Sequence, residues 1–494
     1  MASNLAFVQK PVNTSSQVPV ITNWTPLIGY MVYQSDATTA SYFFYKIILE
    51  VRLTDASGTL LAKIKQRRNG YSADVTANKA RAFFDIREIV NTQLVNTLLD
   101  QYTTDITGLD ATLYKTIHKV GANTPSRPFS LNGDALNGKT QIEQIYVKAY
   151  QQYSTTATGA IQEVVTDTIN DTLFYLQATL PLFTARSTDN AYIQSDAFNS
   201  YHQGGSGDLF LSKVSLSSGD VVGGSVLRNY LLSSDYHTVS FLNNNSNFGS
   251  NVKYIEIVYY NSAGGQINDK EYIQNVVSNG GIAPDDGSLT DAGRLIYFGC
   301  GTANLEAQSD KTDARPSNNS GYAYYTIRGT SNNTDTINYV TTTYYFILQD
   351  SSCKGFKVRR LAWSNSVGGY DYFNFKFKSS QTVEISRNNY STVLGNFSQQ
   401  DYSYYNTGRG KTTKNTTAIL KETLNTDYIT EAQADLLEDL LKSNNVHIVE
   451  NADTTYTQAV VITDSSFVRK TVANDKLIQY TIQIEYANPL NTNN

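Results

Sequence analysis

The sequence predicts a mainly β protein built from β-sandwich domains, with a small α+β module at its C-terminal end. Three observations carry this prediction. The 494-residue chain is rich in strand-favouring aromatic residues, with 36 Tyr and 20 Phe. Asn- and Gly-rich stretches, which favour turns, separate short runs of alternating apolar and polar residues. Charged residues make up only 17% of the chain, below the roughly 25% of ordinary soluble proteins.

The length and the changes of pattern along the chain divide it into four parts, since a domain takes roughly 100 to 200 residues. We expect an extended arm over residues 1–30 and an N-terminal β-sandwich domain with one helix over 31–200. A second β-rich domain follows over 201–415, and the α+β module covers 416–494.

The first 30 residues are polar and hold Pro11, Pro19 and Pro26, which leaves them no core of their own. We therefore expect this N-terminal arm to become ordered against another chain. Deleting Ala2 to Val20 should then impair assembly while leaving the melting temperature of the isolated subunit nearly unchanged.

The N-terminal domain begins with a predicted hairpin. Apolar residues alternate from Phe43 to Leu53, the pattern breaks at residues 55–58, and it resumes from Leu60. Asp85 then offers a side-chain cap to a helix of about four turns, with Glu88 three residues later.

The second domain is predicted from further short strands and Gly-rich turns. A turn at residues 260–265 is similar to that at 55–58, which is compatible with two related sandwich domains. The strand-like runs beyond the first hairpin cover residues 142–150, 173–182, 252–260, 294–298 and 339–348.

A hairpin at residues 359–378 holds most of the candidate functional residues. An apolar run ends at Trp363, a polar turn closes on Gly368 and Gly369, and aromatic residues then alternate with polar ones. Buried Phe373, Phe375 and Phe377 are expected on one face, with Asn374, Lys376 and Lys378 in solvent on the other. We expect Trp363 to close one end of a sandwich, and Asn365 and Asp371 to bind turn amides. The alternative is that Trp363 is a platform for stacking a sugar.

The C-terminal module is predicted around one helix. Thr430 and Gln433 form a capping box, so the helix should run from Glu431 to about Lys442. Its apolar stripe comprises Ala432, Leu436, Leu437, Leu440 and Leu441. We expect Leu436 and Leu440 to pack on the terminal strand, where apolar residues alternate from Ile478 to Tyr486.

Several classes of function find no support in the sequence. A net charge of −5 without a long basic cluster argues against a groove for nucleic acid. The four His residues lie at least 35 residues apart, and no metal-binding or nucleophile motif is complete. Asp285, Asp286 and Asp291 are interpreted as solvated turn residues rather than a calcium site, and Cys300 and Cys353 as buried thiols. We therefore expect no enzyme activity, no catalytic residue, no metal and no cofactor.

The first residues lack a basic stretch followed by an apolar one, and no segment approaches the roughly 18 apolar residues of a membrane span. We expect a protein made in the cytosol that remains soluble.

Two segments carry a resemblance to a known family. Residues 360–375 contain an element of the form W-x-N-x-x-G-G-x-D-x-F-x-F, and the C-terminal module ends in the predicted strand of residues 475–488. Both segments resemble parts of structural proteins of tailed bacteriophages of marine and Bacteroidota-type hosts, including crAss-like phages. The resemblance implies a tail, neck or baseplate component that assembles into a ring, located in a virion assembled in the host cytoplasm. It implies a homo-oligomer that docks other virion proteins, without direct recognition of a nucleic-acid sequence and without a membrane.

Two other functions are compatible with the sequence. A glycan-binding or receptor-binding phage protein would use exposed aromatic residues near Asn and Asp as sugar platforms. A β-sandwich glycosidase would need two carboxyl groups about 5 to 10 Å apart in a cleft. A closed ring favours the structural subunit, whereas a monomer or slender trimer favours binding or catalysis.

Overall fold

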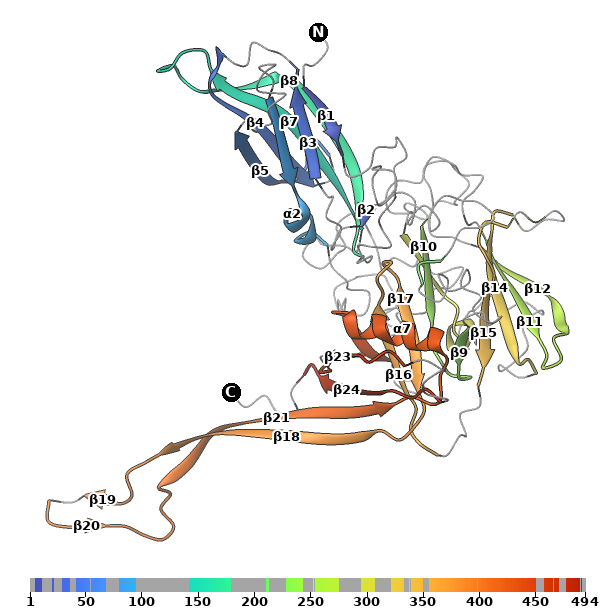
Figure 1. Ribbon diagram of the computed structural model, residues 1–494. Helices are drawn as coiled ribbons and strands as arrows, with labels where there is room; N and C mark the ends of the chain where they lie inside the picture. Colours follow the sequence, from blue (N-terminus) through green and yellow to red (C-terminus); the bar gives the residue numbers. More distant parts are fainter. Residues whose placement is uncertain are drawn as a thin grey trace. The chain divides into compact units, whose positions relative to one another are not determined.

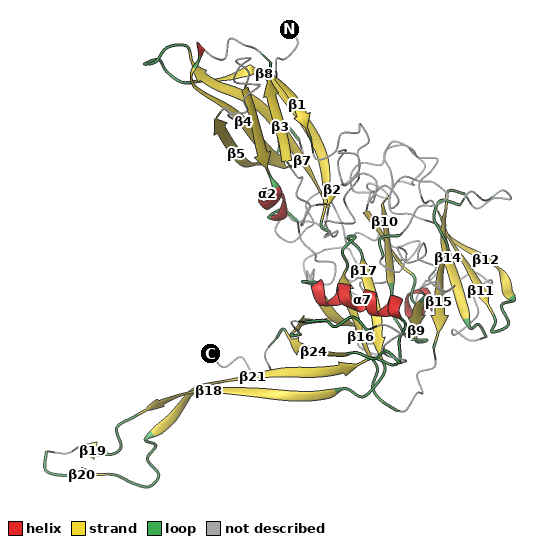
Figure 2. Ribbon diagram, in the orientation of Figure 1, coloured by secondary structure: helices red, strands yellow, loops and turns green. Residues whose placement is uncertain are grey.

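The computed structural model shows a mainly β protein (Figures 1 and 2). It describes residues 5–10, 20–21, 29–35, 41–53, 55–67, 80–94, 142–178, 210–212, 228–242, 252, 254–274, 295–306, 321–332, 337, 339–349, 355–397, 399–449, 457–464, 466–470, 477–488 and 490. The chain divides into two compact units. Unit 1 comprises Met1–Gln349, Ser364–Asp371 and Asn451–Thr455, and unit 2 comprises Asp350–Trp363, Tyr372–Glu450 and Tyr456–Asn494.

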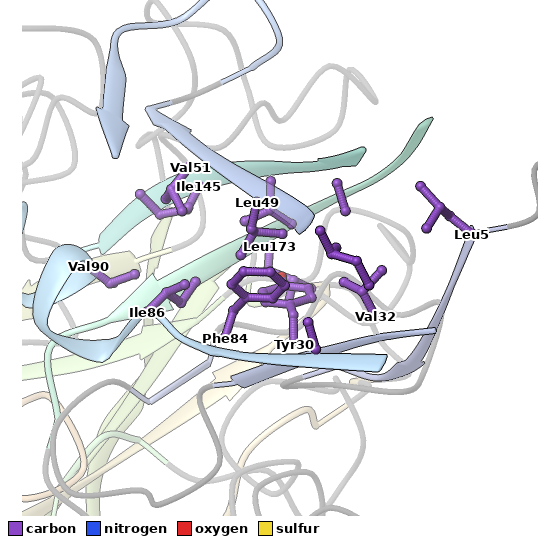
Figure 3. Close-up of a cluster of buried hydrophobic side chains, with 14 of the residues drawn as sticks. Leu5, Tyr30, Val32, Leu49, Val51, Phe84, Ile86, Val90, Ile145 and Leu173 are labelled. Carbon is purple, nitrogen blue, oxygen red and sulfur yellow. The ribbon is translucent and has the colours of Figure 1, made fainter. Parts of the chain in front are cut away.

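Unit 1 begins with a sandwich of two sheets. One sheet has the order β1-β3-β6, with β1 at Leu5–Gln9, β3 at Gly29–Gln34 and β6 at Ala80–Asp85. The other has the order β2-β8-β7-β4-β5, formed by Val20–Ile21 (β2), Gln162–Leu176 (β8), Ile142–Ser154 (β7), Phe43–Leu53 (β4) and Leu60–Arg67 (β5). Both sheets contribute to one apolar core (Figure 3), which includes Tyr30, Leu49, Phe84 and Leu173.

The predicted first hairpin is confirmed, since β4 and β5 pair antiparallel on either side of the turn. The Asp55 carboxylate fixes this turn by accepting hydrogen bonds from the amide and hydroxyl groups of Ser57, at 2.7 and 2.6 Å. These bonds lower the pKa of Asp55, because they favour its charged form.

Two expectations for this region were wrong. Part of the N-terminal arm belongs to the sandwich: β1 pairs antiparallel with β3, and Leu5 is a buried core residue. The helix expected over four turns is α2, Arg87–Asn91, which is five residues long and begins after Ile86 rather than after Asp85. Asp85 ends β6, where it pairs with Gly29, but its carboxylate still accepts a 3.0 Å hydrogen bond from the amide of Arg87, the first helical residue. The remaining arm residues, 1–4, 11–19 and 22–28, lie outside the described residues, as does Leu98.

A second set of sheets in unit 1 has its own core. The larger sheet has the order β12-β11-β14-β15-β9, and β10 pairs with β13 in a two-stranded sheet. The strands are Asn229–Leu231 (β9), Thr238–Leu242 (β10), Tyr254–Tyr260 (β11), Gln266–Gln274 (β12), Leu295–Gly299 (β13), Tyr324–Thr330 (β14) and Tyr344–Leu348 (β15), and the helix α6 is Thr302–Glu306. The predicted turn at residues 260–265 joins β11 and β12, so the hairpin expected there is confirmed.

Unit 2 is organised around a seven-stranded sheet in the order β17-β16-β22-β23-β24-β21-β18. Its strands are Arg359–Ser364 (β16), Tyr370–Phe375 (β17), Ser380–Ser391 (β18), Lys411–Asn425 (β21), Val446–Val449 (β22), Thr457–Ile462 (β23) and Thr481–Tyr486 (β24). The expected domain boundary at 415/416 falls inside β21 and between strands of this one sheet. Local sequence pattern did not reveal this, because β16 pairs with β22 across more than eighty residues of chain.

The predicted C-terminal helix is confirmed as α7, Glu431–Lys442, with the capping box between Thr430 and Gln433. Leu436 and Leu440 are buried, as is Ala434, whereas Leu441 is partly exposed. The terminal strand also follows its predicted alternation, since its apolar residues from Ile478 to Tyr486 are all buried.

Because β1 belongs to the sandwich, we now expect deletion of the first residues to destabilise the subunit rather than to leave its melting temperature unchanged. Deleting residues 2–10 removes Leu5 from the core and leaves the edge of β3 unpaired, so we predict a lower melting temperature for the isolated subunit. Deleting residues 2–4 alone is the matched control. Equal melting temperatures for both variants and the intact chain would show that β1 contributes nothing to stability.

Candidate functional site

The predicted hairpin is present as β16 and β17, and its turn is closed by one asparagine. The Asn365 side-chain oxygen accepts hydrogen bonds from the amides of Val367 (3.1 Å) and Gly369 (2.9 Å). Its side-chain nitrogen donates to the Asp371 carboxylate and to the Leu211 carbonyl oxygen, each at 3.1 Å. Asn365 therefore uses both ends of its amide to hold a turn that is buried within unit 1.

Asp371 connects the turn to a distant part of the chain. Its carboxylate accepts a 2.5 Å hydrogen bond from the Ser212 hydroxyl and a second bond from the Asn365 side chain. Ser212 follows Leu211 in a short segment, and 159 residues separate Ser212 from Asp371 along the chain. The turn and this segment thus form one buried polar cluster, which the sequence around residues 359–378 did not reveal.

The two turn glycines are required by the local backbone and by close packing. Gly368 has a φ of +93°, which residues with a Cβ rarely adopt, and a Cβ there would lie 2.8 Å from the Leu176 side chain. At Gly369, a Cβ would collide with the carbonyl group of Leu211.

The strands of the hairpin are covered on both faces, which differs from the predicted alternation. Phe375 is buried as expected, and Phe373 is partly buried. On the predicted polar face, Lys378 is exposed as expected and Lys376 is partly exposed, but Asn374 is buried. Asn374 accepts a 2.9 Å hydrogen bond from Arg360, whose guanidinium also lies 5.0 Å from the Tyr372 ring. Asn374 was expected to face solvent, but it contacts the buried side chain of Arg360 instead. The Arg360 charge is stabilised there by the Asn374 amide and the Tyr372 ring.

Trp363 is completely buried, so its ring presents no face to a sugar. Its indole nitrogen has no hydrogen-bond acceptor among the described residues, which leaves packing as its contribution. The burial of Trp363, Leu436 and Leu440 favours structural roles for these residues over a surface for ligands.

The most exposed element of the described chain is the β-ribbon, residues 380–420, which no sequence prediction singled out. All residues of β18 are exposed, and β18 pairs with β21 at the edge of the sheet. β21 pairs with β24 only through residues 421–425, so the earlier part of β21 has β18 as its strand partner. Figure 1 shows the ribbon projecting from the sheet of unit 2, with the small strands β19 (Asn396–Phe397) and β20 (Tyr402–Ser403) at its far end.

The end of the ribbon combines aromatic and basic side chains. Tyr404 and Tyr405 are 62% and 71% exposed, and Tyr390 and Tyr402 are about half exposed. Residues 387–414 contain four basic residues and one acidic residue. Tyr and Arg are enriched in protein interfaces, where a large rigid ring and a planar cation gain contact area at low entropic cost.

A sequence signal for the ribbon exists in retrospect. Thr, Val, Ile and Tyr give residues 382–390 strand propensity, but Arg387 and Asn389 occupy the face that Val383 and Ile385 begin. The facing strand is similarly rich in Thr and Lys from residue 411 to 417. A strand pair without a sustained apolar face predicts a hairpin outside the core.

The root of the ribbon is held by a buried ion pair within unit 2. Arg359 of β16 donates a 2.8 Å hydrogen bond to the Glu422 carboxylate of β21. That carboxylate also accepts hydrogen bonds from Tyr486 of β24 (2.7 Å) and Gln381 of β18 (3.1 Å). Burial alone would raise the pKa of Glu422, but the bonds from Arg359, Tyr486 and Gln381 outweigh it and lower the pKa.

Two further charged networks lie on the sandwich sheets of unit 1. Lys63 and Lys65 bind the Glu163 carboxylate at 2.6 and 2.9 Å, which holds the pKa of Glu163 at about 2. Glu256 accepts hydrogen bonds from Lys270 (2.9 Å) and Tyr272 (2.8 Å). The first network links β5 to β8, which are separated in the sheet by β4 and β7, and the second links the neighbouring strands β11 and β12. These carboxylates therefore join strands.

Among the described residues, no three His, Cys, Asp or Glu side chains are grouped to hold a metal ion, and no helix is long and apolar enough to cross a membrane. Cys300 is a buried cysteine that forms no disulfide among the described residues, which agrees with the prediction of a buried thiol for this residue. Cys353 and the three aspartates considered for calcium, Asp285, Asp286 and Asp291, lie outside the described residues.

Comparison of the sequence with models of known protein families and with curated proteins finds no match.

Trp363 allows a direct test of the structural interpretation. We predict that Trp363→Ala lowers the free energy of unfolding by about 3 to 5 kcal/mol, because a fully buried large ring leaves a cavity. Trp363→Phe should cost much less, since the indole N–H has no protein partner to lose. Chemical denaturation measures both, and a Trp363→Ala protein as stable as the intact chain would contradict the assigned role.

The ion pair at the root of the ribbon predicts a pH dependence. Because the pKa of Glu422 is lowered on folding from the ordinary value of 4.5, its contribution is complete above that pH and is lost as the pH falls through the folded-state value. Glu422→Gln should therefore be less stable at pH 7 and lose less stability between pH 7 and pH 3. Parallel acid-induced unfolding curves for the two proteins would show that Glu422 does not contribute.

Proposed function

We propose that this chain is a non-enzymatic structural subunit of a bacteriophage virion, which forms an oligomeric ring in the tail, neck or baseplate. The observation that carries the proposal is the exposed β-ribbon. A two-stranded hairpin is marginally stable alone in water, so a ribbon that projects from its sheet is suited to being covered by another protein.

Two sequence features support the same proposal. The low charged fraction and abundant Tyr suit surfaces that are exposed to solvent in the free subunit and become buried on assembly. Residues 360–375 and 475–488 resemble structural proteins of tailed bacteriophages, and the described residues of both segments belong to strands and turns rather than to an exposed reactive site.

The proposed partners are other copies of this chain and neighbouring virion proteins. The proposed location is the virion, assembled in the host cytoplasm. Binding at these surfaces requires no cofactor, no membrane and no readout of a nucleic-acid sequence, because protein interfaces of this kind are formed by aromatic, basic and backbone groups.

A phage receptor-binding or glycan-binding protein is the second candidate. One observation favours it: Tyr402, Tyr404 and Tyr405 are exposed close together in sequence at the end of the ribbon, where their rings are available to stack on sugars. Trp363, the residue first considered for such a platform, is buried.

Mass and shape in solution test the proposal. We predict that the purified chain, alone or with its neighbouring virion proteins, forms a closed ring of one defined copy number. Native mass spectrometry gives the copy number, and negative-stain electron microscopy gives the shape. A monomer or slender trimer that binds host cells or glycans, with binding lost on replacing Tyr404 and Tyr405 by Ala, would instead support the receptor-binding protein.

A further inference from the structure

Among the described residues, β18 has no strand partner on its outer edge. β18 is the last strand in the sheet order, and its 12 residues give an edge about 40 Å long at the usual rise of a strand. Natural edge strands are commonly protected by Pro and Lys, and β18 contains neither, although a bulge interrupts it between Asn388 and Asn389. The opposite edge of the ribbon is partly covered, because the Leu490 amide donates to the Ala418 carbonyl oxygen.

The face of the ribbon next to this edge offers apolar area as well as backbone groups. Val383 lies opposite Leu420, and Ile385 lies opposite Ala418, so these four side chains share one face. Val383 and Ile385 are each nearly half exposed. Backbone pairing along the edge would therefore be accompanied by burial of apolar surface.

The charge of the ribbon differs from that of the rest of the chain. Residues 387–414 carry a net charge of +3, whereas the whole chain carries −5. Lys411 and Lys414 are exposed at the far part of β21, and Arg409 immediately precedes that strand. A basic segment that projects from an otherwise acidic protein is electrostatically complementary to the acidic surface of another copy.

The complementary surface is α7, the most acidic short segment of the sequence. Its residues 431–439 contain four acidic residues, and with Lys442 the helix has a net charge of −3. The apolar side of the helix is buried, so its acidic residues occupy the outer side, with Glu431 and Asp435 exposed. Glu438 is bound by Lys442 and Arg469, at 2.5 and 2.6 Å.

We propose that the β-ribbon docks on a second copy of this chain, with its basic end against the acidic side of α7 in that copy. This inference rests on the proposed ring-forming function and names the surfaces that make the contact. Because the two surfaces differ, each subunit donates one ribbon and accepts another, which is the head-to-tail contact that closes into a ring.

Charge reversal tests this contact. We expect Lys411→Glu with Lys414→Glu to weaken self-association by about tenfold or more, and Asp435→Lys with Asp439→Lys to do the same, since each places like charges across the contact. A protein carrying all four substitutions should recover association, because its acidic ribbon again meets a basic helix. Sedimentation velocity over a concentration series at low and high salt measures the effect, and the association should weaken as salt rises.

Two controls show whether the charge reversals act on this contact alone. Arg67→Glu with Lys378→Glu reverses two other exposed basic residues and should leave association unchanged. Thermal melts should show that each variant remains folded. A labelled single-stranded oligonucleotide that binds the intact chain and not the Lys411/Lys414 variant, with association unaffected, would assign the ribbon to nucleic acid and overturn the inference.

The outcomes for the two proposals are distinguishable. If the intact chain associates and the ribbon variant associates equally well, or if the fourfold variant does not recover, the ribbon contact is wrong while ring formation stands. If the intact chain remains monomeric at every concentration, alone and with its neighbouring virion proteins, the ring-forming function itself is overturned.

Discussion

One buried carboxylate, Glu422, joins four strands of the seven-stranded sheet that organises unit 2. Hydrogen bonds reach it from Arg359 of β16, Gln381 of β18 and Tyr486 of β24, while Glu422 itself lies on β21. β16 and β21 are separated in the sheet by three other strands, so the sheet must curve for Arg359 to reach Glu422. Removing one partner would leave a charge buried without compensation, which makes this cluster a strong constraint on the curvature.

The same cluster determines where the ribbon begins. Residues 421–425 of β21 pair with β24 and so belong to the main sheet. Residues 411–420 of β21 have β18 as their strand partner and form the ribbon. The ribbon therefore has a rigid root and an exposed end. An exposed end on a fixed root can present Tyr and basic residues at a defined place, which an unanchored loop would do at a higher entropic cost.

Tyr hydroxyl groups supply several of the hydrogen bonds to buried acceptors inside the domains. Tyr259, Tyr325 and Tyr486 are buried, and their hydroxyl groups donate to Glu271, to the Cys300 carbonyl oxygen and to Glu422, respectively. A Tyr side chain supplies a large apolar area and satisfies a buried acceptor with one group. The low charged fraction of the sequence is consistent with this use of Tyr and Asn inside the domains.

The sequence alone determined the features that depend on neighbouring residues. The mainly β class, the hairpin at residues 43–67, the capping of α7 and the alternation from Ile478 to Tyr486 follow from strand propensity, turn chemistry and side-chain periodicity, which act over a few residues. The pairing of strands across long stretches of chain depends instead on tertiary contacts. These contacts placed Leu5 in the sandwich core, joined Ser212 to Asp371 and put β18 at the edge of the described seven-stranded sheet. The physical reason is that local pattern gives a strand its two faces, whereas its partners, and therefore its burial, are set by contacts between residues far apart in the sequence.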